Sequence, residues 1–133
     1  MYSVTKEIYF CYGHRLLNYD GPCRHLHGHN GKAEIELTCE KLDERGMVVD
    51  FGEIRKALKD WIDQTLDHTL LLSRNDPLIS ILKEKGERFY LLNGNPTAEA
   101  IARLIYNYAR SKNLPVKRVT LWETESSFAS YEE

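Results

Sequence analysis

Two segments near the amino terminus alternate between apolar and polar residues, a pattern typical of half-buried strands. Over residues 4–12 the even positions are mostly apolar, with Lys6 as the exception. Residues 32–40 alternate more regularly, with Glu34, Glu36 and Glu40 among the polar positions. The apolar positions of this second segment are Ala33, Ile35, Leu37 and Cys39. The pattern predicts two strands, each with one buried face and one solvated face.

Two later segments carry apolar residues at helical spacing. Asp50 precedes the first and Glu53 follows three residues later, which is the spacing of an N-terminal capping box. The apolar stripe of this helix comprises Phe51, Ile54, Leu58, Trp61, Ile62 and Leu66. Asn95 is predicted to cap the second helix, with Pro96 at its first helical position. That helix has to end before Pro115.

The carboxyl-terminal segments 116–122 and 126–131 are predicted to form two more strands, joined by a tight turn near Thr124-Glu125. The resulting element order is ββααββ. It predicts an α+β fold, a four-stranded antiparallel sheet with two helices on one face. Such a sheet has two edges to protect, and pairing them with other subunits predicts an oligomer.

Composition narrows the class of protein. The chain of 133 residues is predicted to form one domain over residues 1–133, with a net charge of −2. It has no basic block for nucleic acid and no apolar run for a membrane, so neither partner is predicted. Its three cysteines form no C-x-x-C pair, and no signal peptide is recognisable. These features predict a cytoplasmic protein, with Cys11 and Cys39 as small buried strand residues.

Three histidines indicate metal chemistry. His27 and His29 are separated by one residue, so on a strand both side chains point to the same face. His14 follows the first predicted strand and can join them from the neighbouring strand. Three imidazoles suit Zn²⁺ and leave its fourth tetrahedral position open to water or substrate. The alternative is that His27 and His29 are surface loop residues beside Gly28.

Other polar residues allow more than one interpretation. Cys23 is a thiol accessible beside a metal, and it can act as a base or nucleophile, fill a small buried position, or close the metal site as a fourth ligand. Asp67-His68 can exchange protons or can be a surface dipeptide at a helix end. Glu123 can bind the guanidine-like edge of a pterin or guanine, or it can be a solvated strand-end carboxylate.

Taken together, these motifs resemble the 6-pyruvoyl-tetrahydropterin synthase superfamily. The chain is most similar to its 6-carboxy-5,6,7,8-tetrahydropterin synthases, which act in queuosine biosynthesis. The matching segments, which span nearly the whole chain, are F-x-x-x-H-R-L at 10–16, C-x-x-x-H-G-H at 23–29, V-D-F at 49–51, L-D-H at 66–68, P-T-A-E at 96–99 and E-T at 123–124. Three residues between Cys23 and His27 favour the carboxy-forming branch over the pyruvoyl-forming branch.

The resemblance implies a role for each matching residue. His14, His27 and His29 correspond to the ligands of a Zn²⁺ cofactor. Cys23 corresponds to the catalytic thiol that accepts a proton. Its proton-relay partners, supplied by a neighbouring subunit, correspond to Asp67 and His68. The substrate-binding residues correspond to Glu123, which anchors the pterin, and to Thr97 and Glu99.

The resemblance also implies an assembly and a reaction. The family fold, the T-fold, forms trimers whose sheets close into a β-barrel, and trimers pair into hexamers with active sites at subunit interfaces. The implied reaction converts 7,8-dihydroneopterin triphosphate to 6-carboxy-5,6,7,8-tetrahydropterin, releasing triphosphate and acetaldehyde. The alternatives are a 6-pyruvoyl-tetrahydropterin synthase and a non-catalytic zinc- or pterin-binding homologue. Tyr12 and Leu72 depart from the family pattern.

Overall fold

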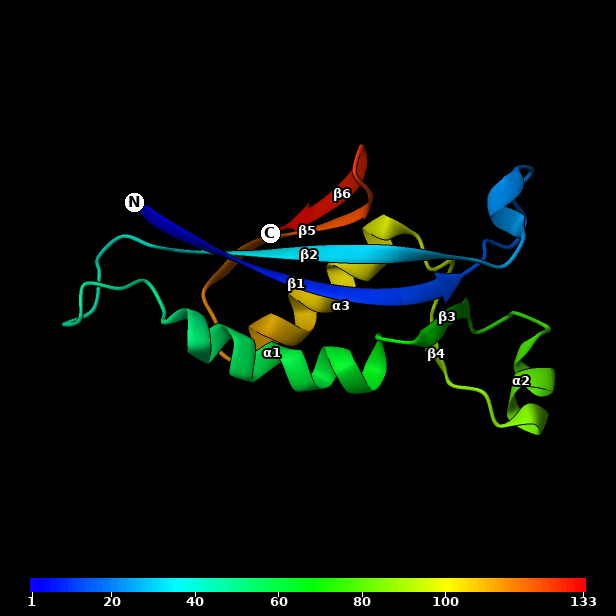
Figure 1. Cartoon of the computed structure of the whole chain (residues 1–133). Helices are drawn as coiled ribbons and strands as arrows, with labels where there is room; N and C mark the ends of the chain where they lie inside the picture. Colours follow the sequence, from blue (N-terminus) through cyan, green and yellow to red (C-terminus); the bar gives the residue numbers. More distant parts are fainter.

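The computed structural model describes residues 1–133 as a curled six-stranded sheet with three α-helices (Figure 1). In chain order the elements are β1 (Tyr2–His14), a short 3₁₀ turn (Pro22–Arg24), β2 (His27–Cys39), α1 (Phe51–Thr65), β3 (Thr69–Ser73), α2 (Ile79–Lys85), β4 (Phe89–Leu92), α3 (Ala98–Ser111), β5 (Val116–Thr124) and β6 (Ser127–Glu132). The strand order in the sheet is β4-β3-β1-β2-β5-β6. The α+β class predicted from the sequence is confirmed.

The first two strands form the backbone of the sheet. β1 and β2 pair antiparallel along their whole length, from Tyr2 opposite Cys39 to His14 opposite His27. One face of this pair is buried, and its apolar residues are Ile8, Phe10, Tyr12, Ala33, Ile35 and Leu37. The other face is solvated, as the exposed ring of Tyr9 shows. The alternation in the sequence therefore predicted which face of each strand is buried.

Helices α1 and α3 cover the same face of the sheet (Figure 1). Asp50 caps α1 as predicted, because its side chain accepts a hydrogen bond from the Gly52 amide. The capping-box interpretation of Glu53 was wrong, since that side chain pairs with Arg45 instead. The predicted cap of α3 was also wrong. Thr97 caps it, because its hydroxyl accepts a hydrogen bond from the amide of Ala100.

The prediction of four antiparallel strands and two helices was incomplete. Between α1 and α3 the chain adds β3, α2 and β4, and both extra strands run parallel to their neighbours. β3 has the sequence TLLLS and is almost fully buried. Such a run lacks the alternation of a half-buried strand, and this is typical of parallel strands covered on both faces. Its position determines where His68 lies.

Two further features bear on the sequence predictions. None of the helices has the length and apolar character needed to cross a membrane. The cysteines, Cys11, Cys23 and Cys39, are free and half-buried. Cys11 and Cys39 lie in β1 and β2, where strands were expected, but neither belongs to the fully buried core.

Candidate functional site

The pairing of β1 with β2 brings the three histidines together. His14 lies opposite His27, and His29 lies opposite Tyr12. Because strand side chains alternate between faces, all four point to the face that carries the core. The ligand nitrogens of the three histidines lie within 4.8 Å of one another. The three-histidine site (His14, His27 and His29) is thus the polar end of the helix-covered face.

Hydrogen bonds to backbone carbonyls fix the tautomer of two of the histidines, and so determine which ring nitrogen is free to bind a metal. Nδ1 of His14 lies 2.7 Å from the carbonyl oxygen of Pro96, and Nδ1 of His27 lies 2.7 Å from that of His25. A carbonyl oxygen only accepts, so in both rings Nδ1 carries the hydrogen and Nε2 keeps its lone pair. Backbone carbonyls orient metal-binding histidines in the same way. The arrangement prepares both rings to be ligands.

The spacing of the nitrogens fits a tetrahedral metal ion. Nε2 of His14 and Nε2 of His29 are 3.2 Å apart, close to the ~3.3 Å edge expected for two nitrogens on tetrahedral Zn²⁺. Burial lowers the pKa of His14 and so favours the neutral, metal-binding form. The residues present therefore fit Zn²⁺, with three nitrogen ligands and an open fourth position.

Glu123, at the end of β5, lies beside this site. Its carboxylate oxygens are 3.9 Å from Nε2 of His14 and 3.8 Å from Nε2 of His29. The carboxylate is therefore close enough to contact a molecule bound at the open position of the metal. Its role in substrate binding stays a prediction.

Tyr12 is packed against the same site. Its ring meets His14 edge-on, with ring centroids 5.2 Å apart, and lies 5.6 Å from that of His29. Its buried hydroxyl lies near the Glu123 carboxylate but outside ordinary hydrogen-bond geometry. Burial and the negative charge of Glu123 both raise the pKa of Tyr12. Tyr12, which the sequence marked only as a departure from the family pattern, is thus a neutral phenol in the wall of the metal site.

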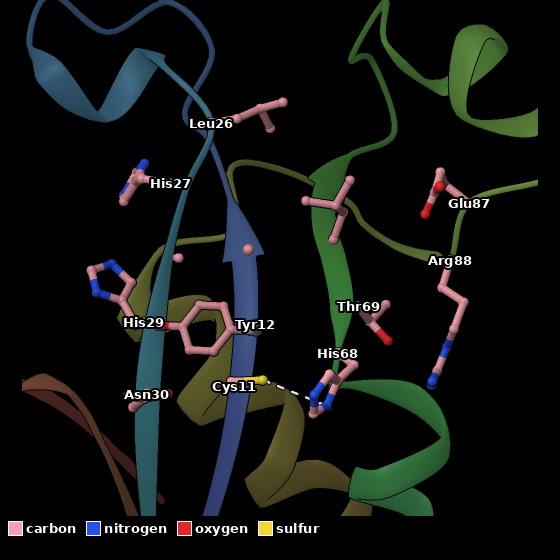
Figure 2. Close-up of a pocket in the computed structure, with 13 residues that line it drawn as sticks. Cys11, Tyr12, Leu26, His27, His29, Asn30, His68, Thr69, Glu87 and Arg88 are labelled. Carbon is pink, nitrogen blue, oxygen red and sulfur yellow. Dashed lines mark hydrogen bonds between the residues drawn. The ribbon is translucent and has the colours of Figure 1, made fainter. Parts of the chain in front are cut away.

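A second donor cluster (Cys11, Asp67 and His68) lies on the opposite face of β1. Figure 2 shows two of its members, Cys11 and His68. Sγ of Cys11 is 3.5 Å from Nδ1 of His68, and that nitrogen is 2.8 Å from Oδ2 of Asp67. Oδ1 of Asp67 accepts a hydrogen bond of 2.9 Å from the Cys11 amide. Burial raises the pKa of Asp67, but the hydrogen bonds from Cys11 and His68 outweigh it, so that pKa is lowered.

Within one chain, Cys23, Thr97 and Glu99 are not among the donors of either cluster. Cys23 lies in the 3₁₀ turn and contributes to neither donor cluster. Thr97 uses its hydroxyl to cap α3, and Glu99 is exposed in the first turn of that helix. The thiol that contacts His68 is Cys11, which was expected to be only a strand residue. Detecting this contact from the sequence would have required recognising β3 and its pairing with β1.

Arg15 anchors the end of β1 directly after His14. Its guanidinium donates two hydrogen bonds, of 2.8 and 2.5 Å, to the carboxylate of Asp76, whose side chain is fully buried. These bonds, ahead of the opposing effect of burial, lower the pKa of Asp76. The pair ties the end of β1, which carries His14, to the segment before α2. The sequence showed no signal for it, because the partners are 61 positions apart.

A cavity of about 580 Å³ opens beside the second donor cluster. Cys11, His68, Leu70 and Arg88 line it, and so do Leu26 and His27 at the start of β2 (Figure 2). Arg88 also donates hydrogen bonds to the carbonyl oxygens of Asp63 and Gln64 at the end of α1. The cavity is large enough to admit a small molecule.

The fold and the site define an α+β protein with three clustered histidines that could hold a divalent metal. A family profile described as 6-pyruvoyl tetrahydropterin synthase matches residues 3–133, and the chain belongs to this family. The resemblance inferred from the motifs is thereby confirmed.

Two curated relatives narrow the comparison. A protein of Rickettsia bellii named 6-carboxy-5,6,7,8-tetrahydropterin synthase is 38% identical, over 96% of this chain and 98% of its own length. A protein of Haemophilus influenzae with the same name is 30% identical, over the whole of both chains. Both relatives are named as synthases of a tetrahydropterin, so the similarity extends to enzymes.

Solved structures share the architecture. An uncharacterized protein from Wolinella succinogenes is 28% identical with a TM-score of 0.82, over 99% of this chain and 98% of the other. The 6-pyruvoyl tetrahydropterin synthase of Caenorhabditis elegans has a TM-score of 0.74 at 21% identity, over 99% of this chain and 95% of the other. At that identity the second comparison shows the fold alone.

Proposed function

We propose that this chain is a zinc-dependent 6-carboxy-5,6,7,8-tetrahydropterin synthase that acts in queuosine biosynthesis. Its substrate would be 7,8-dihydroneopterin triphosphate, with triphosphate and acetaldehyde released. The observation that carries the proposal is the three-histidine site, where the Nε2 lone pairs of His14 and His27 are fixed by carbonyl partners. The names of the curated relatives, at 30–38% identity, support the choice of product.

The three-histidine site would hold the metal. Bound Zn²⁺ acts as a Lewis acid that makes the hydroxyl groups and neighbouring C–H bonds of a substrate side chain more acidic. His14 is buried, which excludes bulk water from that side of the site. Glu123 would bind the substrate next to the metal, since its oxygens lie 3.8–3.9 Å from two ligand nitrogens. Thr97 and Glu99 would contribute to the pterin pocket.

Proton transfer would involve Cys23, Asp67 and His68. In this proposal Cys23 accepts a proton from the substrate side chain, and His68 with Asp67 returns one at another position. Asp67 suits this role because it accepts the Nδ1 hydrogen of His68 and leaves Nε2 free to exchange protons.

The proposed active site combines two subunits. Within one chain, the side chains of the second donor cluster and of the three-histidine site point to opposite faces of the sheet. A trimer or hexamer would allow Asp67 and His68 of one subunit to complete the site of its neighbour. The proposal therefore includes active sites at subunit interfaces.

The test is product identification. Purified zinc-loaded protein is incubated with 7,8-dihydroneopterin triphosphate, and the pterin product and acetaldehyde are measured by mass spectrometry. Release of 6-carboxy-5,6,7,8-tetrahydropterin supports the proposal, whereas 6-pyruvoyl-tetrahydropterin identifies the alternative synthase. Absence of turnover in a protein that binds zinc and the pterin identifies a non-catalytic homologue.

A cysteine series tests the assignment of the thiol. Cys23→Ala is expected to abolish turnover while its zinc content stays near that of the unsubstituted protein, because Cys23 is not among the clustered donors of the three-histidine site. Cys39→Ala, at the far end of β2, is the matched control and should retain activity. If Cys23→Ala keeps full activity and Cys11→Ala loses it, the proton-accepting thiol is Cys11 and not Cys23.

A further inference from the structure

The second donor cluster has the geometry of a metal site distinct from the three-histidine site. It offers a thiol, an imidazole nitrogen and a carboxylate, whose ligand atoms lie within 4.8 Å of one another. Sγ of Cys11 and Nδ1 of His68 are 3.5 Å apart. That distance equals the edge of about 3.5 Å expected for sulfur at ~2.3 Å and nitrogen at ~2.05 Å from tetrahedral Zn²⁺.

The third donor needs only a small adjustment. Oδ2 of Asp67 lies 2.8 Å from Nδ1 of His68, where they share a hydrogen. Replacing that hydrogen by Zn²⁺ requires the two atoms to separate to about 3.3 Å. The side chain of Asp67 is 27% exposed and that of His68 is 73% exposed, so both have room to rotate.

The backbone holds these donors next to each other. The His68 amide donates a hydrogen bond of 2.7 Å to the carbonyl oxygen of Cys11, and the Cys11 amide donates one of 2.9 Å to Asp67. His68 has a φ of 55°, a left-handed conformation that is strained for a residue other than glycine. Backbone strain of this kind persists where the surrounding structure holds a functional residue in place.

We propose that Cys11, Asp67 and His68 form a second binding site for Zn²⁺ or another thiophilic divalent cation. On binding, the Cys11 thiol releases its proton to solvent, and the His68 imidazole moves its hydrogen from Nδ1 to Nε2. Sγ, Nδ1 and Oδ2 then become ligands, and the fourth position faces the cavity lined by Cys11 and His68. This donor set, one thiolate with nitrogen and oxygen ligands, suits Zn²⁺ and Co²⁺ rather than Mg²⁺.

The second site has a regulatory consequence, which rests on the proposed function. A cation at this site occupies Nδ1 of His68 and the carboxylate of Asp67, and both are the proposed proton-relay groups. One equivalent of zinc per chain is therefore expected to activate the protein, and further zinc to inhibit it. Through Cys11, the concentration of free metal ions would control whether Asp67 and His68 are available for proton transfer.

Cobalt titration tests the site without reference to activity. Co²⁺ is added to metal-free protein, and the near-ultraviolet thiolate-to-cobalt absorption is recorded together with the number of equivalents bound. Two equivalents are expected. The histidine ligands bind one without a thiolate band, and the second donor cluster binds the other with that band. In His27→Ala, which lacks one ligand of the first site, the thiolate band is expected to remain.

Substitutions of the three cysteines identify the ligand. Cys11→Ser is expected to lose the thiolate band and the second equivalent, whereas Cys39→Ser and Cys23→Ser keep both. Binding of the first equivalent by Cys11→Ser, together with an unchanged circular dichroism spectrum, shows that this variant is folded. A single equivalent in the unsubstituted protein, or a band that survives in Cys11→Ser, would overturn the proposal.

Activity measurements separate this proposal from the proposed function. Each protein is assayed with rising zinc and normalised to its own rate at one equivalent. Inhibition of the unsubstituted protein that is absent from Cys11→Ser supports regulation through this site. A protein that can bind two equivalents but does not turn over the pterin triphosphate at one equivalent would refute the function and leave the second site intact. Turnover by a protein that binds no more than one equivalent would refute the second site and leave the function intact.

Discussion

The ion pair between Arg15 and Asp76, at the end of β1, allows the loss of stability in Asp76→Asn to be predicted. The Asp76 carboxylate accepts three hydrogen bonds, two from Arg15 and one of 2.8 Å from the Leu78 amide. Its side chain is 0% exposed and that of Arg15 is 21% exposed. Removing one partner of a buried ion pair costs roughly 3–5 kcal/mol. The lower value of about 3 kcal/mol applies here, because Arg15 retains some contact with water.

Urea denaturation of metal-free protein, followed by circular dichroism, measures this loss. In thermal denaturation, a loss of about 3 kcal/mol in unfolding free energy corresponds to a fall in Tm of roughly 10 °C for a chain of this size, given an unfolding entropy of ~2.1 cal/mol/K per residue. Asp63→Asn is the matched control, because its pair with Lys59 is partly exposed and contributes less than about 1 kcal/mol. A loss in Asp76→Asn no larger than in the control would refute the reasoning.

The same pair predicts a pH dependence. The pKa of folded Asp76 lies below its ordinary value because of the hydrogen bonds from Arg15. Ionised Asp76 therefore stabilises the fold fully above the unfolded pKa of about 3.9, and this stabilisation is lost as pH falls through the lower folded pKa. The difference in unfolding free energy between the two proteins is expected to be constant from about pH 5 to 8 and to shrink below about pH 4. A difference that persists at low pH would contradict this assignment.

Two further substitutions test the surroundings of the site. Tyr12→Phe removes a buried hydroxyl that lies outside ordinary hydrogen-bond geometry, so the metal-free variant is expected to be more stable by about 1 kcal/mol in thermal denaturation; a loss of similar size would show that the hydroxyl is satisfied. Thr97→Ala removes the cap on the Ala100 amide and is expected to lower the free energy of unfolding by about 1 kcal/mol, whereas Thr97→Ser should retain the cap. Equal losses in both Thr97 variants would exclude the capping role.

The sequence predicted the parts of the fold that follow a local rule. Alternation identified the buried face of β1 and β2, and helical spacing identified α1 and α3. The same rule placed His27 and His29 on one face, and their union with His14 followed from antiparallel pairing. These predictions succeeded because each depends on residues close in sequence or on a neighbouring strand.

The remaining features depend on contacts between distant segments. The pairing of β3 with β1 could not be inferred, because a short, fully buried run has no periodicity to distinguish a strand from the end of a helix. Without that pairing, the contact between Cys11 and His68 was hidden. The Arg15–Asp76 pair was also missed, because its partners are 61 positions apart in the sequence. The assembly and the roles of Cys23, Thr97 and Glu99 stay predictions, because they depend on a substrate and on neighbouring subunits that a single chain does not contain.

The opposite orientation of Cys11 and His14 on β1 has a consequence for how this segment can vary in length. The two residues are separated by an odd number of positions, and in a strand odd spacing means opposite faces. Inserting or deleting a single residue between them would turn both side chains toward the same face. A change of two residues would preserve the orientation. The parity of this spacing, and not only the identity of the residues, is therefore what keeps the two donor clusters on separate sides of one strand.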